Sequence, residues 1–282
     1  MMVSFRAIVR YRDLDRQAFR DRYPTATLIE AKTKSRRRKY LVEDRGERLL
    51  VSVTNADSNA NVTERTLIAA LSSLGIPVPH VVALFQDGAC WYLVHEFVDG
   101  ILLQDRLAAA DKKESRRLGG IMGTLLQRLH SFPIQQFAGL PAPKGSWWQW
   151  IKHLMPELSI PPLLMESETE IAFVHNDFLP HNIILKGDGS GVAALIDFEW
   201  AFLGDPTWDI GYLRWWVETG GYPYPEDCWE GIGVAYRRPF DEEAASFYAS
   251  VRCPEPMEWW RDSKPPPIAW LSEEDLTDIS AP

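Results

Sequence analysis

The side chains best suited to chemistry in this sequence lie in residues 175–182 and at one later aspartate. The octet reads HNDFLPHN, and Asp197 ends an apolar run further along the chain. Phosphoryl transfer needs a carboxylate that orients the acceptor hydroxyl and accepts its proton, and hard oxygen ligands for the Mg²⁺ that bridges the phosphates. Asp177, Asn182 and Asp197 are residues of these types. The pattern therefore predicts a phosphotransfer centre.

A different metal site is the alternative interpretation of the same octet. His175, Asp177 and His181 match part of the two-histidine, one-carboxylate triad that binds non-haem iron. In that pattern the second histidine lies far downstream on another strand, whereas His181 is close to Asp177. The position of Asn182 favours magnesium.

Apolar segments on both sides of the octet predict the elements that position it. Residues 171–174 and 183–185 are short apolar strands, and residues 193–196 form another that ends at Asp197. The glycine-rich segment 187–191 turns the chain between the last two. We therefore expect Asp177, Asn182 and Asp197 to converge at one end of a sheet.

The first part of the chain reads as a β-meander with one helix. Strand patterns cover residues 27–31, 39–42, 48–53, 81–86 and 91–97. The Asp87-Gly88 dipeptide between the last two is typical of a tight hairpin. Residues 61–74 have helical spacing of apolar side chains and end before a Gly-Ile-Pro-Val-Pro segment. The prediction is a five-stranded antiparallel sheet with one helix.

From Val98 onward the sequence becomes mainly helical. Residues 114–130 place leucine, isoleucine and methionine on one face, and a helix is also expected over 209–217. The fold class is thus α+β, with an N-terminal part at 1–97 and a C-terminal part at 98–282. Residues 259–282 read as an extended acidic tail.

Composition narrows the class of protein. The 282 residues are 46% hydrophobic, with a formal net charge of -9 and a pI near 5.2, which argues against nucleic acid or an anionic membrane as a partner. Three widely spaced cysteines predict neither disulfides nor a zinc site. No signal peptide or membrane span is apparent, so we expect a cytoplasmic protein.

Two further motifs follow the octet in the chain. The interval from Asp177 to Asn182 equals that of the protein-kinase catalytic loop, H-R-D-x-x-x-x-N. HNDFLPHN, LIDFEWA and GDPTWDIGYL follow one another in the chain. In this respect the sequence resembles the aminoglycoside phosphotransferase and choline kinase superfamily, whose motifs are H-G-D-x-x-x-x-N, I-D-[FW] and G-D-P. The resemblance implies a protein-kinase-like two-lobed fold, with a nucleotide-binding lobe at 1–97 and a catalytic and acceptor-binding lobe at 98–282.

The resemblance also implies roles for individual residues. Asp177 would be the catalytic carboxylate, His175 would brace the loop, and Asn182 and Asp197 would bind Mg²⁺. The adenine edge would meet main-chain groups near Glu96 and Val98, and Glu64 would hold the helix position that pairs with a strand lysine. The implied reaction transfers the γ-phosphoryl group of ATP or GTP to a hydroxyl of a small acceptor, such as an aminoglycoside, another antibiotic or an amino alcohol. Such an acceptor is cationic in part of the family, and antibiotic resistance is the implied role.

One position departs from the family pattern. Ser52 stands where the strand lysine is expected, and a hydroxyl does not neutralise a phosphate. Lys34 and Lys39, in the basic segment between the first two strands, are our hypothesis for substitute cations. The alternative is a pseudokinase-like binding protein with little or no transfer. Protein-kinase activity is disfavoured because the segment between Asp197 and Gly204 is too short for an activation loop.

The C-terminal part also contains two aspartates and many tryptophans whose roles the sequence leaves open. We expect Asp205 and Asp209 to be structural, by fixing the catalytic loop or capping the next helix, rather than to bind a cation. Most tryptophans should pack in the core. A subset could line a cleft beside Glu199 and Glu218 and stack on a cationic, aromatic or sugar acceptor.

Overall fold

The computed structural model describes residues 13–33, 37–55, 60–137, 139–156 and 158–252. Two compact units are distinguished, one formed by residues 1–65 with 80–97 and the other by residues 66–79 with 98–282. Strands dominate the first unit and helices the second, so the chain has the α+β class that the sequence predicts. Lys34 and the expected tail at 259–282 lie outside the described residues. Within the described residues, no helix is both long and apolar enough to cross a membrane.

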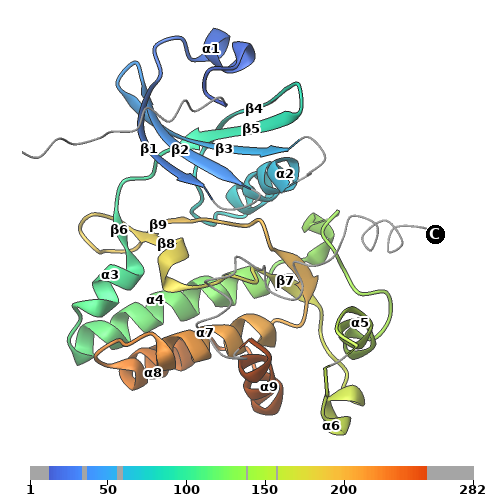
Figure 1. Ribbon diagram of the computed structural model, residues 1–282. Helices are drawn as coiled ribbons and strands as arrows, with labels where there is room; N and C mark the ends of the chain where they lie inside the picture. Colours follow the sequence, from blue (N-terminus) through green and yellow to red (C-terminus); the bar gives the residue numbers. More distant parts are fainter. Residues whose placement is uncertain (1–12, 34–36, 56–59, 138, 157, 253–282) are drawn as a thin grey trace, which may run out of the picture. The chain divides into compact units, whose positions relative to one another are not determined.

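The N-terminal unit is built on a five-stranded antiparallel sheet with the order β1-β2-β3-β5-β4 (Figure 1). Its strands are β1 (Thr27–Thr33), β2 (Arg38–Asp44), β3 (Glu47–Asn55), β4 (Val81–Asp87) and β5 (Cys90–Glu96). Helix α2 (Ala60–Ser73) follows β3 and begins in this unit, and Asn61 near its start donates to the main-chain carbonyls of Ser52 and Trp91. The five strands and this helix match the sequence prediction.

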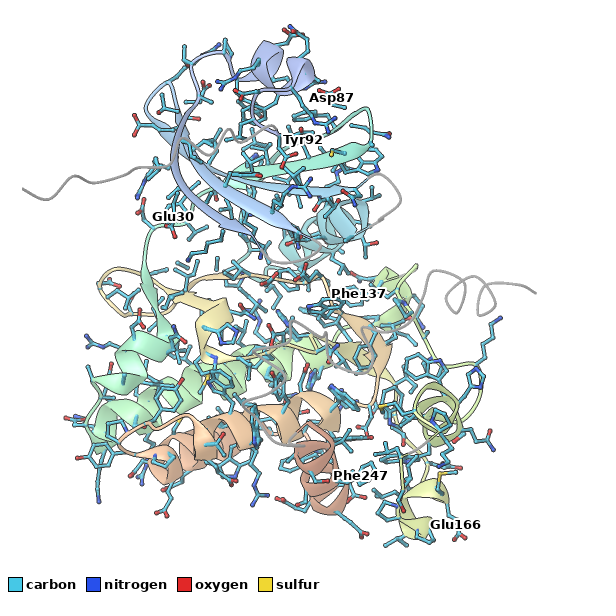
Figure 2. The ribbon with its side chains drawn as sticks, in the orientation of Figure 1. Glu30, Asp87, Tyr92, Phe137, Glu166 and Phe247 are labelled. Atoms are coloured by element: carbon cyan, nitrogen blue, oxygen red, sulfur yellow. The ribbon has the colours of Figure 1, made fainter. Side chains whose placement is uncertain are left out.

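Successive side chains of β3 point to opposite faces of the sheet, one apolar and the other polar. Leu49, Val51 and Val53 join a buried cluster with aromatic and aliphatic side chains from the neighbouring strands. Tyr92 on β5 belongs to this cluster (Figure 2). Ser52 therefore points to the opposite face, where it is also fully buried.

A short helix that the sequence analysis did not assign precedes the sheet. Helix α1 (Gln17–Arg22) buries Phe19 against the ring of Tyr92, with 6.0 Å between the ring centroids. The carboxylate of Asp87 accepts a hydrogen bond from the Ala18 N–H over 3.1 Å. This bond satisfies a backbone donor near the helix start, which has no intrahelical partner.

The C-terminal unit is mainly helical. Its helices are α3 (Leu103–Ala108), α4 (Lys112–His130), α5 (Trp147–Leu154), α6 (Pro162–Met165), α7 (Thr207–Thr219), α8 (Pro225–Ala235) and α9 (Glu242–Arg252). The long helix α4 begins with a side-chain cap, because Asp111 accepts the Glu114 N–H over 2.8 Å. A core of packed aromatic residues includes Trp147, Trp148 and Trp150, as expected for most tryptophans of this part.

Helices α4 and α8 pack at unusually close range because glycines line their contact. A Cβ atom at Gly119 would lie 2.0 Å from the Cys228 carbonyl oxygen, and one at Gly231 would lie 2.0 Å from the Arg116 carbonyl oxygen. No side chain fits at either position. The glycines therefore fix the distance between the two helices.

Small sheets carry the segment that the sequence analysis singled out. Strand β7 (Ala172–Val174) pairs with β10 (Phe202–Gly204), and β8 (Ile183–Leu185) pairs with β6 (Ile101–Leu102) and β9 (Val192–Leu195). The octet 175–182 connects β7 to β8. Its last residues form a single 3-10 turn, Pro180–Asn182.

Candidate active site

The loop between β7 and β8 folds back on itself through Asp177 and Asn182. The side-chain amide of Asn182 donates to the Asp177 carboxylate over 2.7 Å and to the Asp177 main-chain oxygen over 2.9 Å. The Leu179 N–H also donates to that main-chain oxygen over 2.9 Å. These bonds hold the carboxylate in one orientation, and they leave the amide oxygen of Asn182 as its acceptor atom.

Asp197 lies at the end of β9, beside the same loop. The N–H of Ile196, the preceding residue, donates to the Asn182 carbonyl over 3.0 Å. Asp197 is close enough to Asp177 for its negative charge to act on that carboxylate, in the direction that raises the pKa of Asp177 and against its net lowering. Asp197 adopts a left-handed backbone conformation with a φ of 69°, which is uncommon outside glycine, asparagine and aspartate. The three residues proposed from the sequence are thus neighbours.

His181 lies beside the Asp177 carboxylate. Its Nε2 atom lies 3.7 Å from Asp177 Oδ2. Burial raises the pKa of Asp177, but the hydrogen bond and charge of His181 lower it, and the net pKa is below the ordinary value. Asp177 is therefore ionised at neutral pH and able to accept a proton.

A buried carboxylate from α7 holds the start of the loop. Asp209 accepts the backbone N–H of His175 and that of Asn176, each over 2.8 Å. Its side chain is inaccessible to solvent. Hydrogen bonds to a buried carboxylate are strong because the acceptor is charged. Asp209 thus holds the start of the loop between β7 and β8, as in the structural role expected from the sequence.

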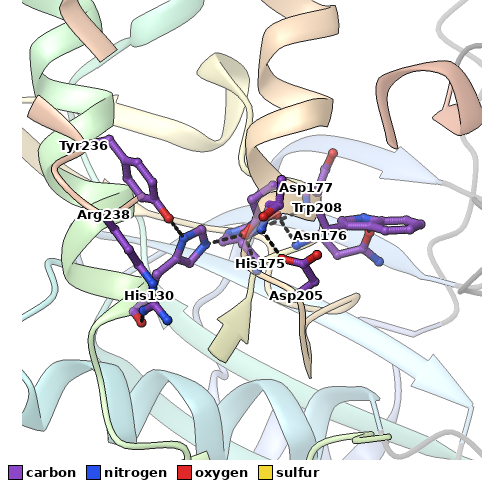
Figure 3. Close-up of polar contacts among 10 residues, drawn as sticks. His130, His175, Asn176, Asp177, Asp205, Trp208, Tyr236 and Arg238 are labelled. Atoms are coloured by element: carbon purple, nitrogen blue, oxygen red, sulfur yellow. Dashed lines mark hydrogen bonds and ion pairs between the residues drawn. The ribbon is translucent and has the colours of Figure 1, made fainter. Parts of the chain in front are cut away.

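Side chains farther from the loop hold Asp209 in place. His130, the last residue of α4, lies with its Nε2 3.2 Å from Asp209 and its Nδ1 2.8 Å from the Tyr236 hydroxyl (Figure 3). Arg238 donates to the His130 main-chain oxygen. The sequence analysis assigned no role to His130, Tyr236 or Arg238, and the positions of the last two follow from the packing of α8 on α4.

Asn176 occupies the position that is glycine in the family motif. Its φ of 66° is left-handed, which explains why glycine or asparagine is needed there. The asparagine side chain adds contacts that glycine lacks. Its Nδ2 donates to the Trp200 carbonyl over 3.0 Å, and its Oδ1 accepts from the indole of Trp208 over 2.9 Å.

His175 is fully buried inside the loop. Its Nδ1 accepts a hydrogen bond from the Asp177 N–H over 3.3 Å, which supports the expected bracing role, and its Nε2 is buried. Burial lowers the pKa of His175 below its ordinary value, so the ring is neutral at neutral pH. Three carboxylates oppose this shift through their charges: Asp209, Asp177 and Asp197.

Asp205 is a second buried aspartate of the C-terminal unit. It accepts the Thr207 N–H at the start of α7 over 2.8 Å and the Tyr248 hydroxyl over 2.8 Å. Burial raises the pKa of Asp205 above its ordinary value, although these hydrogen bonds partly offset the shift. Its position at the start of α7 agrees with the expected structural role.

In the N-terminal unit, Glu64 of α2 has an arginine partner. Arg37, immediately before β2, forms an ion pair with Glu64, and each side chain is only 5% exposed. Lys39 lies opposite Ser52 in the β2 and β3 register. Arg37, Lys39 and Glu64 all act electrostatically on His95, so they form one charged cluster on the buried polar face. The sequence analysis proposed Lys34 and Lys39 as substitute cations and did not identify Arg37 as the partner of Glu64.

The segment expected to contact adenine begins at the end of β5. The Glu96 N–H donates to the His80 carbonyl over 3.0 Å, and the Glu96 carbonyl lies 3.1 Å from His95 Nδ1. The Glu96 carboxylate accepts the His80 N–H over 3.1 Å. The main-chain groups of Glu96 are therefore engaged within the unit. Val98 is the first residue of the adjoining C-terminal segment.

A comparison with known families is decisive for the class of the protein. The profile of the phosphotransferase enzyme family matches residues 27–248, which is more than half of the chain. The chain belongs to the phosphotransferase enzyme family.

Solved structures of aminoglycoside phosphotransferases have the same kinase-like fold. The aminoglycoside-3'-phosphotransferase of type VIII is 20% identical, with a TM-score of 0.63 over 82% of this chain and 94% of that one. APH(3'')-Id from Streptomyces rimosus, in complex with ADP and streptomycin, is 20% identical, with a TM-score of 0.56 over 74% of this chain and 87% of that one. At these identities the likeness concerns the fold.

A curated relative comes from Mus musculus. Acyl-CoA dehydrogenase family member 10 is 28% identical over 179 residues, which cover 55% of this chain and 17% of the mouse protein. The matched part is therefore a small share of a much longer protein.

The donor atoms around the loop of this phosphotransferase-family protein fit magnesium. Asp177, Asn182 and Asp197 present carboxylate and amide oxygens, the hard ligands that Mg²⁺ prefers. Within the described residues, no group of three or more His, Cys, Asp or Glu side chains forms a metal cage. Mg²⁺ is usually held by one or two carboxylates together with substrate phosphates and water, so a sparse protein donor set is suitable.

Proposed function

We propose that the protein transfers the γ-phosphoryl group of ATP or GTP to a hydroxyl of a small molecule, with Mg²⁺ as cofactor. The observation that carries this proposal is the Asp177 carboxylate, oriented by the Asn182 amide over 2.7 Å beside Asp197. Family membership supports the class of reaction. The complex of the Streptomyces rimosus relative with ADP and streptomycin supports a nucleotide and a hydroxylated acceptor as substrates.

Asp177 orients the acceptor and accepts its proton. The acceptor O–H bond breaks as the acceptor oxygen bonds to the γ-phosphorus, and the bond from that phosphorus to the bridging oxygen breaks, which releases ADP or GDP. The lowered pKa of Asp177 keeps its carboxylate ready as the proton acceptor. General base catalysis of this kind contributes about 10²–10⁴-fold to a rate.

Asn182 and Asp197 are the proposed metal ligands, with the Asn182 amide oxygen and the Asp197 carboxylate as donors. Bound Mg²⁺ would neutralise charge on the transferring phosphates. The bond from Ile196 to the Asn182 carbonyl over 3.0 Å keeps the two ligand-bearing segments together. His175 and Asp209 are positioning residues, because they act on the loop backbone rather than on the substrate.

On the nucleotide side, Arg37 is the proposed substitute for the strand lysine. Glu64 holds one edge of its guanidinium, while a guanidinium has five N–H donors and keeps its charge when buried. Lys39, opposite Ser52, adds a second cation to the same cluster. Lys34 belongs to the same hypothesis. Main-chain groups near Glu96 and Val98 are the proposed partners of the nucleotide base.

In this proposal, the two parts of the chain have different roles. Residues 1–97 bind the nucleotide, and residues 98–282 provide the catalytic loop and bind the acceptor. Aminoglycosides, other antibiotics and amino alcohols are the acceptor classes that the family suggests. The reaction would take place in the cytoplasm, and modification of an antibiotic would confer resistance.

A second candidate function is favoured by Ser52. A buried hydroxyl in place of the lysine is the change expected in a pseudokinase-like protein that binds ligands with little transfer. Calorimetry of ATP binding with and without Mg²⁺ separates the two functions, because an intact centre binds the nucleotide more tightly when Mg²⁺ is present.

The proposed activity is tested by incubating the protein with Mg²⁺, ATP or GTP and a panel of hydroxylated acceptors. Phosphorylated product is identified by its mass. We expect one acceptor class to gain a phosphoryl group in a Mg²⁺-dependent manner. Absence of product with every acceptor, together with Mg²⁺-independent nucleotide binding, would favour the binding protein.

A further inference from the structure

A row of aromatic rings begins at the Asp177 carboxylate and continues along α7. His181, 3.7 Å from Asp177, has its ring centroid 5.3 Å from that of Trp216. Trp216 is 6.0 Å from Trp215, which is stacked with Tyr212 at 5.7 Å and an interplanar angle of 8°. We call these four residues, His181, Trp216, Trp215 and Tyr212, the aromatic row.

The aromatic row differs from the aromatic core of the same unit. Trp147 and Trp148 are almost completely buried, whereas all four members of the row are partly exposed to solvent. One polar atom in the row is also unsatisfied. The indole Nε1 of Trp215 is buried and has no hydrogen-bond partner among the described residues. Buried donors without a partner are rare, so the hydrogen bonding of the row is incomplete at this atom.

The charges on α7 argue against a polycationic ligand. The helix contains two acidic residues, Asp209 and Glu218. Asp209 is buried and accepts from the loop backbone. Glu218 is paired with Arg214 over 2.9 Å, and the same guanidinium contacts Glu242 over 3.1 Å. Asp209 is therefore occupied by the loop, and the charge of the exposed Glu218 is offset by Arg214.

We propose that the aromatic row is the acceptor subsite and that the acceptor is an uncharged alcohol with an aromatic ring close to the reactive hydroxyl. This inference rests on the proposed function, and it narrows the acceptor to one chemical class. The ring of the acceptor stacks on Trp216, and its hydroxyl reaches Asp177. Trp216 is held for this contact, because its indole N–H donates to the Tyr222 hydroxyl over 3.0 Å.

Ring stacking determines how much acceptor binding should weaken when the Trp216 ring is removed. An aromatic pair contributes about 0.5–1.5 kcal/mol beyond the area that it buries, and the lost apolar contact adds to this. Removal of the Trp216 ring should therefore weaken binding of an aromatic acceptor by roughly 10-fold or more. Because the contact is remote from the reacting atoms, KM should rise while kcat changes little.

The test compares two groups of acceptors with the full-length protein, Mg²⁺ and ATP. Pyridoxine, uridine and tyrosol represent aromatic alcohols, and kanamycin, streptomycin and hygromycin B represent polycations. We expect a higher kcat/KM for a member of the aromatic group. Trp216→Ala should raise its KM about 10-fold or more, and Trp216→Phe should restore most of the affinity. Trp229→Ala is the control, since Trp229 is a partly exposed tryptophan of α8 outside the row.

Calorimetry measures the binding of the same compounds independently of their phosphorylation. It therefore distinguishes failure of this inference from failure of the proposed function. Binding of an aromatic alcohol that is lost in Trp216→Ala but gives no product would support the subsite and contradict the transferase activity. Preferred phosphorylation of an aminoglycoside, or an unchanged KM in Trp216→Ala, would overturn the inference. Absence of binding by every aromatic compound would also overturn it.

Discussion

Arg37 and Glu64 form a buried ion pair in the N-terminal unit although they lie 27 positions apart in the chain. The pair places a permanent cation on the polar face of the sheet that also contains Ser52. Arg37→Ala should weaken ATP binding by roughly 10- to 100-fold, because a hydrogen bond to a charged group contributes about 1.5–3 kcal/mol. Isothermal titration calorimetry measures the change.

Loss of Arg37 alone also leaves Glu64 as an uncompensated buried charge. The effect of this charge on folding must therefore be separated from the effect of the substitution on ATP binding. The double variant Arg37→Met with Glu64→Met removes both charges and should fold, because apolar replacement of a buried pair is often neutral. Arg45→Ala is the matched control, since Arg45 is an exposed arginine of the same unit. Unchanged ATP affinity in the folded double variant would contradict the role of Arg37.

Asp197→Asn should weaken the binding of Mg²⁺ without unfolding the protein. Asparagine tolerates the left-handed φ of 69° at this position as aspartate does, so the backbone should be preserved. The Mg²⁺ concentration for half-maximal activity should rise about 10-fold or more, as the loss of a charged metal ligand implies. Asp188→Asn, in an exposed turn, should leave the Mg²⁺ titration unchanged.

Replacement of Asn176 should separate backbone strain from side-chain contacts. Asn176→Gly keeps the left-handed conformation but loses the bonds to Trp200 and Trp208, so it should cost about 1–2 kcal/mol of the free energy of unfolding. Asn176→Ala loses the same bonds and adds a strain of about 1–2 kcal/mol. Urea denaturation should therefore rank alanine below glycine. Equal stability of the two variants would argue against a backbone requirement.

The contact between α4 and α8 should be sensitive to a single methyl group. Gly119→Ala places a Cβ atom 2.0 Å from the Cys228 carbonyl oxygen, whereas the same change at Gly120 meets its nearest atom at 3.9 Å. Gly119→Ala should destabilise the protein by about 1–3 kcal/mol or more. Gly120→Ala should be neutral or stabilising, because alanine is favoured over glycine in a helix by about 1 kcal/mol. Thermal unfolding of the pair measures the difference.

Local patterns in the sequence were sufficient for most of the fold. Period-two alternation in β3 and the apolar stripe of α4 are properties of short segments, so the strands and the long helix could be predicted within a few residues. The spacing of Asp177 and Asn182 is also local, because both residues lie in one loop. Helix α1 was not predicted, since its stability depends on contacts of Phe19 and Ala18 with distant strands.

The parts of the candidate site that depend on tertiary packing could not be read from the sequence. Arg37 belongs to a run of basic residues, and no pattern in that run indicates which one meets Glu64. Tyr236 reaches His130 only because α8 packs closely on α4. The aromatic row likewise joins a loop residue, His181, to side chains of α7.

The central claim is that Asp177 is the carboxylate of a phosphotransfer centre, and one comparison tests it most directly. Transfer of the γ-phosphoryl group from ATP to an acceptor is measured for the wild type and for Asp177→Asn under identical Mg²⁺ conditions. Asparagine keeps the size of the side chain and cannot accept the acceptor proton. We predict a fall in kcat of about 10²–10⁴-fold with nucleotide affinity nearly unchanged. Full transfer activity in Asp177→Asn would contradict the account.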